Sequence, residues 1–159
     1  YQRDNLSYLF DRECCVVHNG TSTQSVTVGA WTALTFNAEQ LDTDAMHDTS
    51  SNTSRINTPN AGIWLCHAYI KWGNLGAAHR STSVGIKHST EASLSPSGEG
   101  AVSHWWYAEH GAGVSRIIEA SSGYVEVYAY LGGGSGTNII VAEAMSHPVF
   151  SVVKIRDGV

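Results

Sequence analysis

The chain carries little charge and few of the basic residues that nucleic-acid binding requires. Only 14% of its 159 residues are charged, and nine Lys and Arg stand against fourteen Asp and Glu, for a net charge of −5 at pH 7. Neutralising the phosphates of a duplex needs clustered Lys and Arg, and this sequence has no such cluster. We therefore expect no nucleic-acid partner.

Long hydrophobic runs are missing as well. No apolar stretch approaches the roughly 18 residues that a membrane-spanning helix needs. No positively charged segment precedes a short apolar one, as it does in a signal peptide. We expect no membrane insertion.

Cysteine is scarce, with three residues at positions 14, 15 and 66. The count is odd and two of the three are adjacent, which does not fit the disulfide framework of a small secreted module. We expect reduced, partly buried thiols.

Sequence motifs of the common enzyme classes are also lacking. The chain has no nucleophile elbow, no HExxH and no P-loop, and its eight histidines never show the close spacing of a zinc site. Asp42 and Asp44 fall on one loop, whereas a general acid and a general base need different environments across a cleft. The sequence therefore predicts a protein that is not an enzyme.

The residues that are abundant favour strands and turns. Sixteen glycines accompany only three prolines, and short runs rich in Val, Thr, Tyr and Trp alternate with Ser, Asn and Gly clusters. The expected strands occupy residues 14–19, 24–36, 54–58, 61–72, 80–88, 101–109, 114–120, 123–131, 138–145 and 148–155. About ten short strands at this spacing predict an all-β sandwich or jelly roll.

The strand expected at 61–72 is apolar on both faces. A strand in an isolated sandwich usually has one face in water, so we expect the second face to meet another subunit. In the strand 123–131 the outer face also carries aromatic rings, which fit an interface better than water. The predicted subunit interface contains Ile63, Leu65, His67, Tyr69, Tyr128 and Tyr130.

Acidic side chains crowd into LDTDAMHD, residues 41–48. Asp42, Asp44 and Asp48 offer the oxygen ligands that a hard cation such as calcium prefers. The stretch does not fit an EF-hand loop, because His47 stands where that loop has its glycine. Two interpretations stay open: a calcium ion at the three carboxylates, or a scaffold loop whose short polar side chains bond backbone amides.

Large aromatic residues are adjacent in HWWYAEHGAG, residues 104–113. Successive residues of a strand point to opposite faces, so at least one large ring lies off the main core. These rings fit either an interface or an aromatic platform for a sugar or a protein, with acidic and histidine partners in the following loop. The predicted ligand-binding residues are Trp105, Trp106, Tyr107, Glu109 and His110.

The order of motifs in TALTFNAEQLDTDAMHDTSSNTSRINTPNAGIWLCHAYIKW, residues 32–72, resembles the C1q/TNF-like jelly-roll domain. The likeness is to the version found in bacteriophage structural proteins, where an L-x-F strand precedes a DTDxMHD loop, an SRI strand and a P-x-x-G strand. GYVEVYAYL (123–131) and SHPVFSVVKI (146–155) resemble the late and closing strands of the same family. Tyr124 departs from that pattern, because the family has an aspartate after the glycine.

The resemblance implies a jelly roll of about ten strands that assembles as a homotrimer, with the inner sheets around the threefold axis. It implies a domain at residues 14–159, preceded at residues 1–13 by an arm that connects to other virion proteins.

The function implied is that of a non-enzymatic virion structural protein on the capsid or tail surface, a fibre or spike head that contacts a host glycan or protein. The alternatives are a capsid-decorating or tail-attached cement protein, and a secreted C1q-like ligand-binding module. No cofactor other than calcium is expected.

Overall fold

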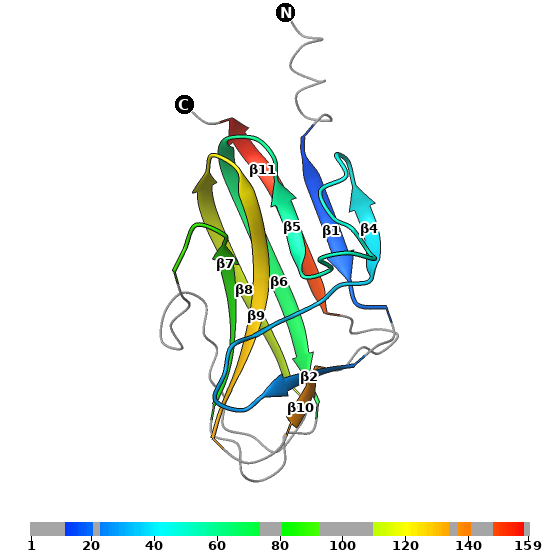
Figure 1. The fold of residues 1–159 in the computed structure, drawn as a ribbon, viewed down its shortest axis with the longest axis vertical. Coiled ribbons are helices and arrows are strands. Elements are labelled where there is room, and N and C mark those ends of the chain that lie inside the picture. Colours follow the sequence, from blue (N-terminus) through cyan, green and yellow to red (C-terminus); the bar gives the residue numbers. More distant parts are fainter. Residues whose placement is uncertain are drawn as a thin grey trace, which may run out of the picture.

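The computed structural model describes residues 12–20, 23–73, 81–92, 110–133, 137–140 and 148–157. These residues form eleven strands in two sheets, and the two layers are visible in Figure 1. Within these ranges no helix is long and apolar enough to cross a bilayer. The strands are β1 (Cys14–His18), β2 (Gln24–Thr27), β3 (Thr32–Ala33), β4 (Ala38–Asp42), β5 (Arg55–Thr58), β6 (Gly62–Trp72), β7 (Ser81–His88), β8 (His110–Ala120), β9 (Gly123–Gly132), β10 (Thr137–Ile140) and β11 (Val149–Asp157).

The larger sheet has the order β2-β10-β6-β11-β1-β4, with β8 on the other side of β6. β6 is its central strand and pairs antiparallel with β8 along its whole length, from Gly62 opposite Ala120 to Trp72 opposite His110. The smaller sheet is built on β9, which pairs with β7, β5 and β3. In Figure 1, β5, β7 and β9 lie in front of β6, β8 and β11.

The core lies between the two sheets and follows the alternation of β6 and β9. Residues of β6 alternate between buried and partly or fully exposed side chains along most of the strand. Full burial of a large apolar side chain contributes about 1.5–3 kcal/mol. The fully buried residues of these two strands are Trp64, Cys66, Ala68, Ile70, Trp72, Val125, Val127, Ala129 and Leu131. The all-β sandwich predicted from the sequence is confirmed.

The expected strands differ from the structure in two places. The stretch 24–36 is interrupted at Gly29, whose φ of 79° is a left-handed conformation that glycine adopts without strain. β4 was not expected, because its residues are mostly exposed and an edge strand of this kind lacks apolar alternation. The strand predicted at 101–109 lies outside the described residues.

The boundary predicted after residue 13 stays a prediction, since residues 1–11 are outside the described ranges. Glu13 itself contacts the domain, because its Oε1 accepts hydrogen bonds from Lys154 Nζ at 3.1 Å and from Asn60 Nδ2 at 2.8 Å.

The three cysteines are free thiols. Cys15 and Cys66 both lie opposite Val152 of β11, one on each side. Two strands that flank a third are about 9–10 Å apart, which is beyond the reach of a disulfide. Burial raises the pKa of the Cys66 thiol to about 12 and also raises the pKa of Cys15, where the nearby Asp42 carboxylate adds to the effect.

We expect the native protein to expose at most one reactive thiol per chain. The thiolate is the reactive form, so Cys15 and Cys66 should resist a thiol reagent at mildly alkaline pH, while Cys14 reacts slowly. Titration with a chromogenic disulfide reagent checks this, with all three thiols reacting in guanidinium chloride. Rapid native reaction of two or more thiols would contradict the buried positions.

Candidate functional site

The loop between β4 and β5 is organised by Asp42. Its Oδ1 accepts a hydrogen bond from the Met46 amide at 2.9 Å and one from the Asp44 amide at 3.2 Å, and its Oδ2 accepts one from the His47 amide at 2.9 Å. An ionised carboxylate that accepts several backbone N–H groups fixes a turn strongly. Met46 is thereby held in the core, with 1% of its surface exposed.

Asp48 organises the second half of the same loop. Its Oδ1 accepts hydrogen bonds from the amide and the hydroxyl of Ser50, at 2.8 and 2.7 Å, and from the Ser51 amide at 3.0 Å. These hydrogen bonds stabilise the ionised form and lower the pKa of Asp48.

The buried His47 ties the loop to its surroundings. Its Nδ1 lies 3.1 Å from Glu39 Oε1, and its Nε2 lies 3.3 Å from the Thr53 carbonyl oxygen. The imidazole therefore bridges β4 and the end of the loop.

The cation site considered at Asp42, Asp44 and Asp48 is not assembled. Asp42 and Asp48 bond the loop's own amides, and Asp44 Oδ2 accepts a hydrogen bond from the Thr43 hydroxyl at 2.6 Å. In the part of the chain that the structure describes, which includes all of residues 41–58, no group of three His, Cys, Asp or Glu side chains could hold a metal ion. These hydrogen bonds favour the scaffold interpretation of the loop, and calcium binding at the three carboxylates stays a prediction.

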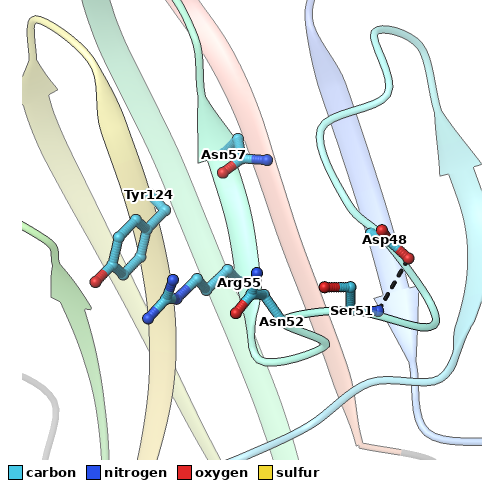
Figure 2. A pocket seen from close by; sticks show the side chains of 6 residues that line it. All are labelled: Asp48, Ser51, Asn52, Arg55, Asn57 and Tyr124. Atoms are coloured by element: carbon cyan, nitrogen blue, oxygen red, sulfur yellow. Dashed lines mark hydrogen bonds between the residues drawn. The ribbon is translucent and has the colours of Figure 1, made fainter.

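The same loop forms one wall of a pocket of about 200 Å³. The pocket is open to solvent and lies against the outward face of the smaller sheet, where β5 and β9 pair (Figure 2). Its lining residues come from the loop, from β5 and from β9: Asp48, Ser51, Asn52, Arg55, Asn57 and Tyr124.

The backbone at Asn52 shapes the turn that leads into β5. Asn52 has a φ of 52°, a left-handed conformation that asparagine tolerates better than most residues. Its carbonyl oxygen accepts a hydrogen bond from the Arg55 amide at 2.9 Å. This turn brings the side chains of Asn52 and Arg55 to the same pocket (Figure 2).

Arg55 is the cation of the pocket and is held by two contacts. Its Nε donates a hydrogen bond to Glu126 Oε1 at 3.2 Å, and its guanidinium carbon lies 4.1 Å from the centre of the Tyr124 ring. A guanidinium at this distance is attracted by the face of the ring. Figure 2 shows the Arg55 side chain reaching toward Tyr124.

Glu126 supports Arg55 from a buried position. Only 8% of its surface is exposed, and its carboxylate also accepts hydrogen bonds from Ser54 Oγ at 2.8 Å and from the Tyr128 hydroxyl at 2.7 Å. Burial and this bond to the carboxylate raise the pKa of Tyr128 to about 12. The buried charge is thus fully paired, and Arg55 is fixed before any ligand arrives.

The six residues predicted for a subunit interface lie on two different faces. Ile63, Leu65, His67 and Tyr69 lie on the outward face of the larger sheet, where residues alternate with the buried face of β6. Tyr128 and Tyr130 lie on the outward face of the smaller sheet. The predicted residues therefore fall on both layers of the sandwich, because β6 and β9 belong to different sheets, and their place in a subunit interface stays a prediction.

The two tyrosines also have contacts within the chain. Tyr128 bonds Glu126, as described above, and the ring of Tyr130 packs against Trp31 with centroids 5.3 Å apart. Both aromatic side chains on the outer face of β9 therefore have partners within the chain, and their place in a subunit interface stays a prediction.

The outward face of the larger sheet carries the exposed large apolar side chains of the described residues. Leu41, Leu65, Tyr69 and Ile117 are 47%, 40%, 38% and 64% exposed, and we call them the apolar face. Leu65 lies directly opposite Ile117 in the pairing of β6 with β8. Leu41 reaches the same side of the sheet through its pairing with Val16. Ile117 and Leu41 were not among the predicted interface residues.

The predicted aromatic binding site cannot be compared with the pocket. Trp105, Trp106, Tyr107 and Glu109 lie outside the described residues, and so does the side chain of His110, whose backbone begins β8. These five residues stay a prediction.

Comparisons with known proteins identify the fold. No protein-family model matches the sequence, and no curated protein matches it. Among solved structures, murine APRIL at pH 8.0 matches with a TM-score of 0.54 and 9% identity, over 90% of this chain and 100% of that one. Eiger TNF from S. frugiperda matches with a TM-score of 0.56 and 10% identity, over 93% of this chain and 95% of that one.

At such low sequence identity, these matches establish the arrangement of the strands only, and the function must be argued from the site itself. The matches do not indicate a bacteriophage origin. They agree with the two-layered architecture and with the predicted class. The chain has a jelly-roll fold of the TNF-like type.

Proposed function

We propose that this protein is a non-enzymatic, ligand-binding domain that works as a homotrimer. The observation that carries the proposal is the apolar face, where Leu41, Leu65, Tyr69 and Ile117 lie exposed on one side of one sheet. Exposed apolar side chains gathered on one face are typical of interaction sites. Further copies of the same chain are the occupant that the TNF-like fold supports.

The polar residues within the apolar face also suit a subunit contact. His67 lies between Ser115 of β8 and Ser151 of β11 in the strand register, and its Nδ1 is 2.8 Å from Ser115 Oγ. Polar groups that already have partners can enter an interface without a large desolvation cost. The face thus combines apolar contact area with satisfied hydrogen bonds, as many interfaces do.

We expect a particle of about three times 17.1 kDa in solution. Light scattering coupled to size-exclusion chromatography measures this mass, and a dilution series shows whether the assembly persists at low concentration. A stable monomer or dimer at every concentration would overturn the homotrimer.

A second candidate function places the protein on a virion. The series DTDAMHD, SRINT and GIW resembles bacteriophage C1q-like proteins, and the structure puts it into the β4–β5 loop, β5 and β6. This series supports a fibre or spike head, or a capsid-decorating or cement protein whose residues 1–13 attach to other virion proteins. Antibody labelling of intact particles separates these roles: fibre tips support a head, capsomers support decoration, and no label supports the ligand-binding module alone.

A further inference from the structure

The pocket beside β5 presents polar groups that have hydrogen-bonding capacity left over within the part of the chain that the structure describes. Asp48 accepts three hydrogen bonds through Oδ1, and its Oδ2 accepts none from the described residues. The side-chain amides of Asn52 and Asn57 and the hydroxyl of Ser51 also have no hydrogen-bond partner among the described residues. Donors and acceptors therefore converge on one hollow, as they do in small-ligand sites.

The charges around the pocket disfavour a charged ligand. The lining carries one cation, Arg55, and one anion, Asp48, and Arg55 is already paired with the buried Glu126. A phosphate or sulfate would face two carboxylates for one guanidinium, and an ammonium ligand would face Arg55. A neutral ligand avoids both the repulsion from the carboxylates and the repulsion from Arg55.

The size and polarity of the pocket further restrict the class of ligand that fits it. A volume of about 200 Å³ falls below the roughly 300–1,000 Å³ of pockets for drug-sized molecules. An apolar molecule gains little from walls made of amides, hydroxyls and charged groups. A hydroxyl group both donates and accepts a hydrogen bond, so a small molecule with several hydroxyls matches this mixed lining.

The walls are also fixed in advance. Asp48 is bound to the Ser50 and Ser51 amides, Asn52 sits in a hydrogen-bonded turn, and Arg55 is clamped between Glu126 and Tyr124. Little side-chain freedom is then lost when a ligand binds, which favours affinity.

We propose that this pocket binds one neutral sugar ring, such as the terminal hexose or N-acetylhexosamine of a glycan. The proposal deepens the ligand-binding function above and rests on it. Asp48 Oδ2 accepts from a ring hydroxyl, the amides of Asn52 and Asn57 donate and accept, and Arg55 donates to a ring or hydroxyl oxygen. Arg55 and Tyr124, which lie side by side in Figure 2, line the side of the pocket that the sugar ring would contact.

The test is a titration of the full chain with the methyl glycosides of galactose, glucose, mannose and N-acetylglucosamine, followed through backbone amide shifts in NMR. We expect at least one to bind in about the millimolar range, with shifts centred on residues 48–57 and Tyr124. Inorganic phosphate and the methyl glycoside of N-acetylneuraminic acid serve as charged probes and should bind at least tenfold more weakly.

Two pocket variants and one matched control make the result specific. Asn52→Gly removes the amide while keeping the left-handed backbone, and Asn57→Ala removes an exposed amide from β5. Each should weaken sugar binding at least tenfold. Gln40→Ala removes an exposed amide from β4, outside the pocket, and should leave binding unchanged.

Several results would overturn the sugar site: no binding of any neutral glycoside, tighter binding of phosphate, binding unchanged in both pocket variants, or shifts centred on residues 104–113. The particle mass is measured on the same samples. A trimer that binds no sugar leaves the proposed trimer standing, whereas a monomer that binds sugar removes the trimer and keeps the site.

Discussion

Ile117→Asp should convert the trimer into monomers of one third the mass while leaving each chain folded. Ile117 is 64% exposed in the single chain, so the aspartate meets water there at little cost. In the assembly the apolar face would bury three such carboxylates without partners, and burying an unpaired charge costs several kcal/mol. We expect the trimer to weaken by about 4 kcal/mol, or roughly a thousandfold.

The measurement is particle mass by light scattering at several concentrations, with circular dichroism to verify the fold. Leu65→Asp, directly opposite Ile117, should give the same result, since it lies in the same face. Ser122→Asp is the matched control, because it adds the same charge at an exposed position in the turn between β8 and β9. An Ile117→Asp chain that keeps the full mass would show that the apolar face is not the subunit contact.

Asp42→Ala should destabilise the protein by about 3 kcal/mol, because three amides of the β4–β5 loop lose their charged acceptor. Asp42→Asn should lose less, since its carbonyl oxygen still serves the amides of Asp44 and Met46. The measurement is the free energy of unfolding in urea at one fixed protein concentration, because an oligomer's stability depends on concentration.

Asp44→Ala is the control for that experiment. Among the described residues, the Asp44 carboxylate bonds only the neighbouring Thr43 hydroxyl, at an exposed position, so its removal should cost less than about 1 kcal/mol. If Asp42→Ala and Asp44→Ala lowered the free energy of unfolding equally, the scaffold role of Asp42 would be contradicted. A function shared by the two carboxylates would then be favoured.

The sequence predicted strands best where apolar residues alternate. In β6 the alternation from Trp64 to Trp72 predicted correctly which side chains enter the core. Alternation does not show which layer of the sandwich a strand joins, so it cannot tell that Tyr128 and Tyr130 lie on a different sheet from the outward residues of β6. β4 gave no signal, because a polar edge strand is held by its backbone pairing with β1.

The site was harder to predict than the fold. The concentration of carboxylates in residues 41–48 marked the right loop, yet the bonds of Asp42 to backbone amides depend on the turn geometry and not on composition. The pocket combines that loop with Tyr124, which reaches it only because β5 pairs with β9 and sets Asn57 opposite Tyr124. Such long-range pairing leaves no local pattern in the chain.

The pocket lies on the smaller sheet and the apolar face on the larger one. This arrangement affects how tightly an assembled trimer could bind a surface that carries many sugars. A trimer closed through the apolar faces would turn three pockets outward, away from its axis. Linked sites on one rigid body raise overall binding by roughly 10²–10⁴ over a single site when several can engage together. A trimer with three weak pockets would then bind a dense layer of sugars much more tightly than it binds the same sugars free in solution.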